Sequence, residues 1–536
     1  MTNKEIADNI NMLAKLMELH GENPFKIKTY ANAYLSLRKI ASPLEDLSAN
    51  DLEKLPNIGK SVSSKIQELI NTGSISELKS LKEKTPEGII ELLQIKGLGP
   101  KKVDVLWKSL GIESVGELLY ACQENRLIEL KGFGQKTQEN LIKLLNYHLE
   151  SKGKWLLGHC YDQAIELEAL LKNRNPELEI SLVGGLKMWN QVVDGIDLLA
   201  SETPLLDGIK NLELDENGEY RYENIPLRIQ MCTKKEYPFY KFKNTCEDDF
   251  FDQLNMPLHW KNEEEIFQFN QLYFIPTERR YGVDVIQEYR NGETDLIDFG
   301  DIKGVIHTHS TYSDGINTIE EMAIKARDEG YSYIAITDHS KSATYANGLS
   351  IERVEMQWRE IDTLNQKLDG IKILKSIESD ILNDGHLDYD NDILNGFDFV
   401  IASIHSNLKM DEEKATARLI AAIEQPFTHI LGHPTGRLLL SREGYPIDHK
   451  KIIDACAANN VSIEINASPY RLDIDYRWLQ YCMEKNVKIS INPDAHSTEA
   501  INYIKWGIMT ARKGGLKREF CLNYNAVDEF LKILNK

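Results

Sequence analysis

The sequence lacks the features of a secreted or membrane-bound protein. Its seven cysteines are an odd number scattered without CxxC spacing, so we expect reduced thiols rather than disulfides. No apolar run reaches the roughly 18 residues that a bilayer-spanning helix needs. The start, MTNKEIADNI, is polar and carries no secretory signal. These absences predict a cytoplasmic protein with no membrane partner.

Low-complexity segments are also absent, and the chain is long enough for several domains. Its 536 residues, of which 42% are hydrophobic, allow three or four domains with cores of their own. The net charge of −20 is uneven: residues 1–150 are neutral, residues 151–300 carry −12 and residues 301–536 carry −8. Phosphate affinity comes largely from Lys and Arg. The middle region is therefore a poor cradle for DNA or a nucleoside triphosphate.

The C-terminal region contains seven short runs rich in Ile and Val, with amphipathic stretches such as residues 318–330 and 448–460 between several of them. The runs are GVIHTHS, YIAITDH, ILKSIESD, FVIASIHS, HILGHP, SIEINAS and KISINPDAH. This rhythm predicts a parallel α/β barrel, in which chemistry collects at the carboxyl ends of the strands. Six of the runs end in potential metal ligands, whereas SIEINAS supplies none. The ligands are His307, His309, Asp314, His339, Glu378, His405, His433, Asp494 and His496.

This set of side chains indicates a multinuclear metal hydrolase. Imidazole and carboxylate together suit Zn, Mn or Fe, and the absence of Cys disfavours a closed structural zinc site. Nine ligands exceed what one ion can use, so we expect two or three ions bridged by Glu378, the only Glu of the set. Such ions can activate water and clamp a phosphoryl group. A single His taken alone is more often a core or surface residue than a metal ligand. The prediction depends on the position of all nine residues at or just after the strand ends.

Seven motifs in this region resemble a known family. They look like the PHP (polymerase and histidinol phosphatase) domain, in the version found at the carboxyl end of bacterial family X DNA polymerases. The motifs are HTHSTYSDG, TDHS, ESDILNDG, ASIHS, GHPTGRLL, INASPYRLD and NPDAHS. The resemblance covers essentially the whole chain. It implies a distorted (β/α)7 barrel with a trinuclear site, often supplied with Mn or Zn.

The resemblance also implies roles for individual residues. One ion would be held by His307, His309, Glu378 and Asp494, a second by Glu378, His405 and His433, and a third by Asp314, His339 and His496. Arg437 and Arg471 match family positions that touch substrate phosphate, where a guanidinium fork suits the oxygens. The alternative for both arginines is a surface salt bridge. The implied catalytic residues are His307, His309, Glu378, Asp494, Arg437 and Arg471.

The N-terminal half contains a repeat that predicts DNA binding. Each copy has small residues in a turn, then basic or polar residues, and then an apolar helix. The three copies are PNIGKSVSSKI, IKGLGPKKVDVL and LKGFGQKTQENL. We read them as three helix-hairpin-helix units, whose backbone N–H groups face phosphate without reading sequence. Asn57 replaces the leading Gly of the first unit, which is tolerable because Asn visits left-handed conformations. The expected DNA contacts are Gly59, Lys60, Lys65, Gly97, Gly99, Lys101, Lys102, Gly132, Gly134 and Lys136.

Residues 1–75 also contain NPFKIKTYANAY, which resembles the small N-terminal domain of the same polymerases. Lys65 falls where relatives place a Schiff-base lysine for deoxyribose-phosphate elimination. A nucleophilic Lys must be desolvated or flanked by charge to lose its proton. The alternative, which we prefer, is a Lys that only contacts phosphate.

The middle of the chain departs from the family. Active relatives read roughly G-S-x-R-R-G-K-E-T-x-G-D-I-D in the palm, where this chain reads GGLKMWNQVVDGIDLL. Gly185, Met188 and Gly195 replace the family's Ser, second Arg and first catalytic Asp, so only Asp197 of the Asp pair remains. The third carboxylate is replaced by Pro226, which cannot ligate a metal. We expect polymerase activity to be lost, unless a one-residue bulge brings Asp194 to the face of Asp197.

We therefore predict a multidomain α+β and α/β protein. Residues 1–80 would be a small helical domain, 81–150 a fingers-like helix-hairpin-helix domain, 151–295 a degenerate nucleotidyltransferase-like palm and thumb, and 300–536 a PHP barrel. The predicted function is a DNA-binding, metal-dependent phosphoesterase, a 3′–5′ exonuclease or DNA end-processing enzyme of DNA repair. Alternatives are a small-molecule phosphatase of the PHP class, an active family X DNA polymerase with a restored palm, and a non-enzymatic DNA-binding scaffold.

Overall fold

The structure is a computed structural model. It describes residues 1–38, 40, 43–95, 97–128, 130, 132–150, 153–215, 217–292 and 294–535. Contacts divide the chain into two compact units. Unit 1 comprises Met1–Cys122 and Leu127–His148, and unit 2 comprises Gln123–Arg126 and Leu149–Lys536. The finer division into four domains stays a prediction. None of the helices among the described residues is long and apolar enough to cross a membrane.

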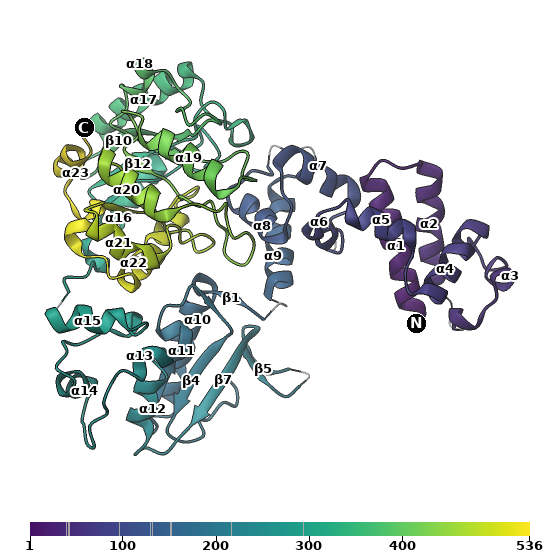
Figure 1. The fold of residues 1–536 in the computed structure, drawn as a ribbon, viewed down its shortest axis with the longest axis horizontal. Helices are drawn as coiled ribbons and strands as arrows, with labels where there is room; N and C mark the ends of the chain where they lie inside the picture. The colour runs from purple at the N-terminus through teal and green to yellow at the C-terminus, as the bar shows by residue number, and fades with distance from the viewer. Residues whose placement is uncertain are drawn as a thin grey trace. The chain divides into compact units, whose positions relative to one another are not determined.

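Unit 1 is helical throughout its described part (Figure 1). Its elements are α1 (Asn3–Leu19), α2 (Pro24–Leu37), η1 (Leu44–Asp46), α3 (Ala49–Leu52), α4 (Lys60–Thr72), α5 (Ser76–Glu83), α6 (Glu87–Leu92), α7 (Pro100–Leu110), α8 (Val115–Gln123) and α9 (Gln135–Glu150). The start of α1 is fixed by a capping box between Thr2 and Glu5. Ile6, Ile10 and Leu13 then recur at helical spacing and are fully buried.

The three predicted hairpins share one backbone geometry. Their leading residues, Asn57, Gly97 and Gly132, have φ values of 61°, 91° and 92°, so the expected left-handed Asn57 is confirmed. The third residue of the first two hairpins is the N-cap of the following helix, Gly59 for α4 and Gly99 for α7, and neither receives a side-chain cap. Backbone N–H groups at these helix starts consequently have no intrahelical partner.

The palm-like region of unit 2 is built on a five-stranded sheet. In spatial order, the strands are β2 (Ile180–Val183), β4 (Ile196–Ala200), β7 (Ile225–Met231), β6 (Tyr220–Tyr222) and β5 (Leu212–Leu214). Strands β4 and β7 are parallel, and the other neighbours are antiparallel. A further pair, β1 (Trp155–Leu156) and β3 (Val192–Val193), is antiparallel. Helix α10 (Leu157–Arg174) buries an apolar face in the same core as this sheet.

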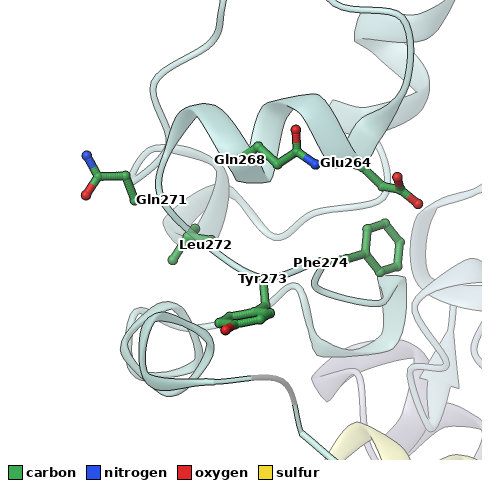
Figure 2. A pocket seen from close by; sticks show the side chains of 6 residues that line it. All are labelled: Glu264, Gln268, Gln271, Leu272, Tyr273 and Phe274. Atoms are coloured by element: carbon green, nitrogen blue, oxygen red, sulfur yellow. The ribbon is translucent and has the colours of Figure 1, made fainter.

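Short helices complete this region: α11 (Gly184–Lys187), α12 (Tyr237–Lys243), α13 (Asp248–Phe251), α14 (Glu263–Phe269), η2 (Thr277–Arg279), α15 (Asp284–Asn291) and η3 (Phe299–Asp301). An open pocket of about 520 Å³ lies beside α14 (Figure 2). Its lining residues are Glu264, Gln268, Gln271, Leu272, Tyr273 and Phe274. None of the predicted metal ligands lines it, so it is not the candidate site.

The C-terminal region contains the predicted parallel barrel, and all seven predicted strands are confirmed. They are β8 (Gly304–Val305), β9 (Tyr333–Ile336), β10 (Lys372–Asp380), β11 (Phe399–Ser403), β12 (Ile430–Leu431), β13 (Ser462–Asn466) and β14 (Ile489–Asn492). They pair in sequence order and in parallel. A parallel bridge between Thr308 and Ala495 nearly closes the ring, just beyond β8 and β14.

Helices follow most strands and lie around the barrel (Figure 1). They are α16 (Ile319–Asp328), η4 (Thr344–Ala346), α17 (Ile351–Lys367), α18 (Asn391–Leu394), α19 (Glu412–Ile423), α20 (His449–Asn459), η5 (Tyr476–Trp478), α21 (Leu479–Glu484), η6 (Glu499–Tyr503), α22 (Ile504–Lys513), η7 (Arg518–Phe520), η8 (Leu522–Tyr524) and α23 (Val527–Leu534). The two amphipathic stretches singled out in the sequence form α16 and α20.

Alternation along the strands gives the barrel two apolar layers. In β9, Tyr333 and Ala335 belong to a core that contains Phe530 of α23, whereas Ile334 and Ile336 belong to the core shared with the surrounding helices. Tyr333 is the first residue of β9, and its ring lies 5.4 Å from that of Phe530. Helix α23 therefore closes the amino-terminal end of the barrel and leaves the carboxyl end for the site.

The palm-like region and the barrel share a core within unit 2. Trp506 and Met509 of α22 and Leu472 of a barrel loop are buried in the same cluster as the apolar residues of the palm-like sheet. A Cβ added at Gly158 would lie 2.5 Å from the Pro469 side chain, so the chains approach closely here. The palm-like region is therefore packed against the loops that surround the barrel's site.

Candidate metal centre

The structure brings all nine predicted ligands together at the carboxyl end of the barrel. His307 and His309 follow β8, Asp314 precedes α16, His339 follows β9, and Glu378 lies in β10. His405, His433, Asp494 and His496 follow β11, β12 and β14. Each of these side chains is at most 5% exposed. Residues spread over 190 positions of sequence therefore form one buried cluster, because parallel strands end at the same edge.

Glu378 lies at the centre of this cluster. Its Oε1 is 3.0 Å from Nε2 of His433, 3.2 Å from Nε2 of His405 and 3.5 Å from Nε2 of His307. Its Oε2 is 3.0 Å from Nδ1 of His339 and 3.7 Å from Nε2 of His309. The two oxygens thus face different imidazoles, which is the arrangement that a bridging carboxylate needs.

Two further carboxylates complete the cluster. Asp494 Oδ1 is 3.1 Å from Nε2 of His309 and 3.4 Å from Nε2 of His307. Asp314 is 3.5 Å from His339 and 3.4 Å from His496 through their Nε2 atoms. Asp494 has a φ of 53°, a conformation that non-glycine residues rarely adopt and that is concentrated at functional sites.

The donor atoms fit metal ions. Several buried potential ligand atoms make no hydrogen bond among the residues that the structure describes, and His339 Nδ1 and Glu378 Oε2 are among them because their 3.0 Å contact lacks hydrogen-bond geometry. These atoms are His307 Nε2, Asp314 Oδ2, both ring nitrogens of His339, Glu378 Oε2, His433 Nδ1 and His496 Nε2. Leaving so many buried polar atoms unpaired is costly unless another group binds them. Ligand atoms within 4.8 Å of one another form the groups His309–Asp314–His339–His496, His307–His309–Glu378 and His339–Glu378–His405. PHP domains depend on metals, and these groups could hold them.

The electrostatics favour anionic carboxylates in this cluster. Burial opposes ionisation of Glu378, but the imidazoles of His405, His307 and His339 hold the pKa of its carboxyl well below the usual value. Burial and the neighbouring His496 and His339 imidazoles lower the pKa of His309 to about 3, so its ring is neutral. Metal binds anionic carboxylates and neutral imidazoles. Although burial opposes it, neighbouring carboxylates raise the pKa of the other rings with a shift, so these would release a proton when a metal binds; they are His307, His339, His405 and His496.

Two carboxylates that orient the ligands were missed in the sequence. His307 Nδ1 donates to Glu464 Oε2 over 2.7 Å, and His405 Nδ1 donates to Asp380 Oδ1 over 2.5 Å. Such bonds fix the ring tautomer and leave Nε2 for metal. SIEINAS supplies no ligand, as expected, but it supplies Glu464. A signal was available for Asp380, because residues two apart on a strand share a face and Asp380 follows Glu378 by two.

The two predicted arginines differ in their surroundings. Arg437 donates to the Asp475 carboxylate over 2.6 Å, to the Arg471 carbonyl over 2.9 Å and to Gln191 Oε1 over 3.1 Å. Its guanidinium is therefore engaged in holding the loop. Arg471 is buried, and its Nη2 lies 3.9 Å from an oxygen of Glu124, a residue that sequence reasoning did not single out. Glu124 also falls in a group of potential ligands with Asp494 and His496.

The predicted DNA-contacting residues lie at the hairpins of unit 1. Lys60 begins α4, Lys101 and Lys102 lie in the first turn of α7, and Lys136 lies in the first turn of α9. Lys65 lies further along α4, where its ammonium is 2.9 Å from Glu68 and 3.7 Å from Glu77. It is thus paired with two carboxylates.

The palm-like region keeps Asp197 as the one residue of the family's catalytic Asp pair. Asp197 on β4 faces Arg228 on β7, which donates to both of its oxygens over 2.6 and 3.0 Å. Asp194 lies in the turn before β4, where it pairs with Lys154 over 2.5 Å. Gly195 has a φ of 148°, and a Cβ there would lie 2.4 Å from the Pro226 carbonyl oxygen. An Asp at position 195 would therefore not fit this backbone.

Comparisons with known proteins agree with this organisation. Residues 1–75 match a helix-hairpin-helix domain, residues 89–146 match a SAM-like helix-hairpin-helix tandem, and residues 306–468 match the PHP domain. With the barrel and its cluster, these matches define a helix-hairpin-helix protein that ends in a metal-dependent PHP domain.

Individual relatives narrow the class to a family. The chain is 33% identical over 570 residues to the protein of Bacillus subtilis (strain 168) named DNA polymerase/3'-5' exonuclease PolX, covering 99% of this chain and 100% of that protein. It therefore belongs to the bacterial PolX family, as the motifs predicted.

Relatives of the barrel alone are also found. A probable phosphatase of Thermoanaerobacter sp. (strain X514) is 30% identical over 240 residues, which is 42% of this chain and 93% of that protein. The probable phosphatase YcdX of Escherichia coli O81 (strain ED1a) is 30% identical over 171 residues, which is 31% of this chain and 64% of that protein. The barrel thus supports a metal-dependent hydrolase of the phosphoesterase type.

Proposed function

We propose that this protein is a DNA-processing phosphoesterase whose barrel hydrolyses phosphodiester bonds at DNA ends as a 3′–5′ exonuclease in DNA repair. The observation that carries the proposal is the buried cluster of nine potential ligands around Glu378, whose unpaired ligand atoms bound cations would satisfy. The hairpins of unit 1 support a nucleic-acid substrate, since their helix starts offer N–H groups to phosphate. We place the protein in the cytoplasm, because its seven cysteines are free thiols and its proposed substrate is DNA.

The residues of the cluster would each have a defined task. His307, His309, Glu378 and Asp494 would hold one ion, Glu378 with His405 and His433 a second, and Asp314, His339 and His496 a third. Bound Mn or Zn ions would lower the pKa of the attacking water and offset charge on the phosphoryl oxygens.

The surrounding residues support this chemistry. Glu464 and Asp380 hold the His307 and His405 rings so that their Nε2 atoms point at the cluster. Arg471 would bind a phosphate oxygen beside it. Arg437 would act through the loop, because its own guanidinium already contacts Asp475.

The palm-like region would not transfer nucleotides in this account. Asp197, the one residue that remains of the family's catalytic Asp pair, is ion-paired with Arg228, and Gly195 leaves no room for a second carboxylate. This region instead packs on the barrel through the core that contains Trp506. We propose that it supports the loops of the metal site.

A small-molecule phosphatase is the second candidate. The phosphatase relatives align with the barrel and need no DNA-binding region, which favours this alternative. The helix-hairpin-helix units would then have no role, which is why we place it second.

The test compares two substrates and two variants. Each protein is incubated with Mn²⁺ and either a 5′-labelled single-stranded oligonucleotide or p-nitrophenyl phosphate. The proteins are wild type, the double variant His307→Ala/His309→Ala and the control His386→Ala. His386 is a suitable control because its side chain is 66% exposed and lies outside the cluster. We expect a ladder of shortened labelled products with wild type and control, and none with the double variant. Hydrolysis of p-nitrophenyl phosphate alone would favour the small-molecule phosphatase, and no reaction would favour a scaffold.

A further inference from the structure

The segment Gln123–Arg126 belongs to unit 2 and is fastened to the loops around the metal centre. Gln123 Nε2 donates to the Tyr470 hydroxyl over 3.1 Å. The guanidinium of Arg126 lies over the Tyr345 ring, 4.5 Å from its centroid. The Tyr345 ring centroid is itself 6.1 Å from that of His339, a member of the nine-ligand cluster.

A second attachment lies between these two. Asn125 Nδ2 donates to the carbonyl of Asp314 over 3.4 Å, and Asn125 has a φ of 55°, which belongs to a tight turn. Four consecutive residues thus follow the rim of the site, with Glu124 in the middle.

The Glu124 side chain is buried among cations and metal ligands. It is 4% exposed and forms an ion pair with Arg126. Its Oε1 lies 3.9 Å from Nη2 of Arg471. Its carboxylate also falls within 4.8 Å of ligand atoms of Asp494 and His496. One carboxylate therefore lies close both to two guanidinium groups and to the nine-ligand cluster.

A phosphate would make the same set of contacts. Guanidinium groups bind carboxylate and phosphate oxygens with the same fork geometry, and the proposed reaction requires a phosphate next to the metals. The surroundings of Glu124 are accordingly those of a phosphate subsite.

We propose that Glu124 occupies the place of the substrate phosphate in the metal centre, and that Arg126 joins Arg471 in binding that phosphate when the substrate displaces the carboxylate. This inference rests on the proposed phosphoesterase function and adds to it two residues from outside the PHP match. In it, Arg126 is a substrate-positioning residue, and Glu124 is a competitor of every phosphate that enters.

The inference is tested by phosphate binding, which does not depend on turnover. Inorganic phosphate is titrated into the metal-loaded full-length protein by calorimetry, and bound metal is measured by mass spectrometry in the same samples. Glu124→Gln keeps the shape of the side chain but removes the competing charge, so phosphate should bind about tenfold more tightly with unchanged metal content. Arg126→Met should weaken phosphate binding about tenfold, also with unchanged metal content.

Controls separate this inference from the function on which it rests. Glu329→Gln changes a carboxylate that pairs with Lys325 on the barrel surface, and it should leave phosphate binding unchanged. Loss of a metal equivalent in Glu124→Gln would show that Glu124 is a metal ligand and would overturn the inference. Unchanged phosphate affinity in both site variants would also overturn it. If the predicted shifts occur while DNA is not cleaved, the phosphate subsite stands and only the nuclease assignment fails.

Discussion

His307 Nδ1 donates to Glu464 Oε2 over 2.7 Å, and both side chains are fully buried. Glu464 lies on β13, the one strand that supplies no ligand, and it also accepts a bond from Asn492 Nδ2 over 2.8 Å. This contact fixes the His307 ring with Nε2 facing Glu378 and Asp494. The strand thus contributes to the centre by orienting a ligand.

Removing the charge of Glu464 should weaken metal binding at the candidate centre but not abolish it. Glu464→Gln retains the size of the side chain but makes a weaker partner for His307, and we expect metal affinity to fall about 10- to 100-fold. Titration of metal-free protein with Zn²⁺ against a competing chelator measures the change. Glu329→Gln is the matched surface control. An affinity equal to that of wild type would show that the contact does not position the ligand.

The palm-like region should not extend a primer. We expect no incorporation of deoxynucleotides on a primer–template with Mg²⁺ or Mn²⁺, because Asp197 is held by Arg228 and position 195 cannot carry a carboxylate. The double variant His307→Ala/His309→Ala is used so that degradation cannot hide extension. Primer extension by this variant would contradict the account and would revive Asp194 as a catalytic residue.

Breaking the core between the palm-like region and the barrel should destabilise the protein. Trp506 is 3% exposed and lies in the cluster shared by both regions. Trp506→Ala should lower the free energy of unfolding by about 3–5 kcal/mol. Thermal unfolding followed by circular dichroism measures this, with Phe269→Ala as an exposed control, since Phe269 is 59% exposed. Equal midpoints for the two variants would mean that the shared core contributes little.

Lys513, whose ammonium donates to the Met188 carbonyl of the palm-like region, should make the stability of the protein depend on pH. Burial lowers the pKa of its ammonium from the ordinary 10.5 to about 8. Because the folded pKa lies below the unfolded one, the unfolded chain binds more protons between pH 8 and pH 10.5. The free energy of unfolding should therefore fall by about 3 kcal/mol as the pH falls from 10.5 to 8. Urea unfolding of wild type and Lys513→Met across this pH range isolates this contribution. A stability difference between them that does not change with pH would contradict it.

Much of the barrel could be predicted from the sequence. Each of the seven runs became a strand in the expected order, since strands buried on both faces read as continuous Ile and Val. The turn geometry of the hairpins was also predictable: Asn57, Gly97 and Gly132 all adopt a positive φ. The approach of all nine ligands followed from parallel topology alone.

The supporting residues could not be predicted in the same way. Glu464 reads as one acidic residue in an apolar strand, and its role depends on which ring faces it across the barrel. Glu124 lies 370 positions from Asp494, and nothing in the residues around it resembles a site. Arg437 matched a phosphate-contacting position, but its hydrogen bonds to Asp475, Gln191 and the carbonyls of Arg471 and Leu472 emerge only from the packed loops. Such roles depend on tertiary distances that local patterns do not contain.

The most direct test of a Glu378-centred multinuclear site is the bound-metal stoichiometry of the full-length protein. Wild type and Glu378→Gln are loaded with Mn²⁺ or Zn²⁺, dialysed, and analysed by inductively coupled plasma mass spectrometry. We expect two or three ions per chain in wild type and at least one fewer in Glu378→Gln, with phosphodiester hydrolysis lost in the variant. A single ion in wild type, or an unchanged count in the variant, would contradict it.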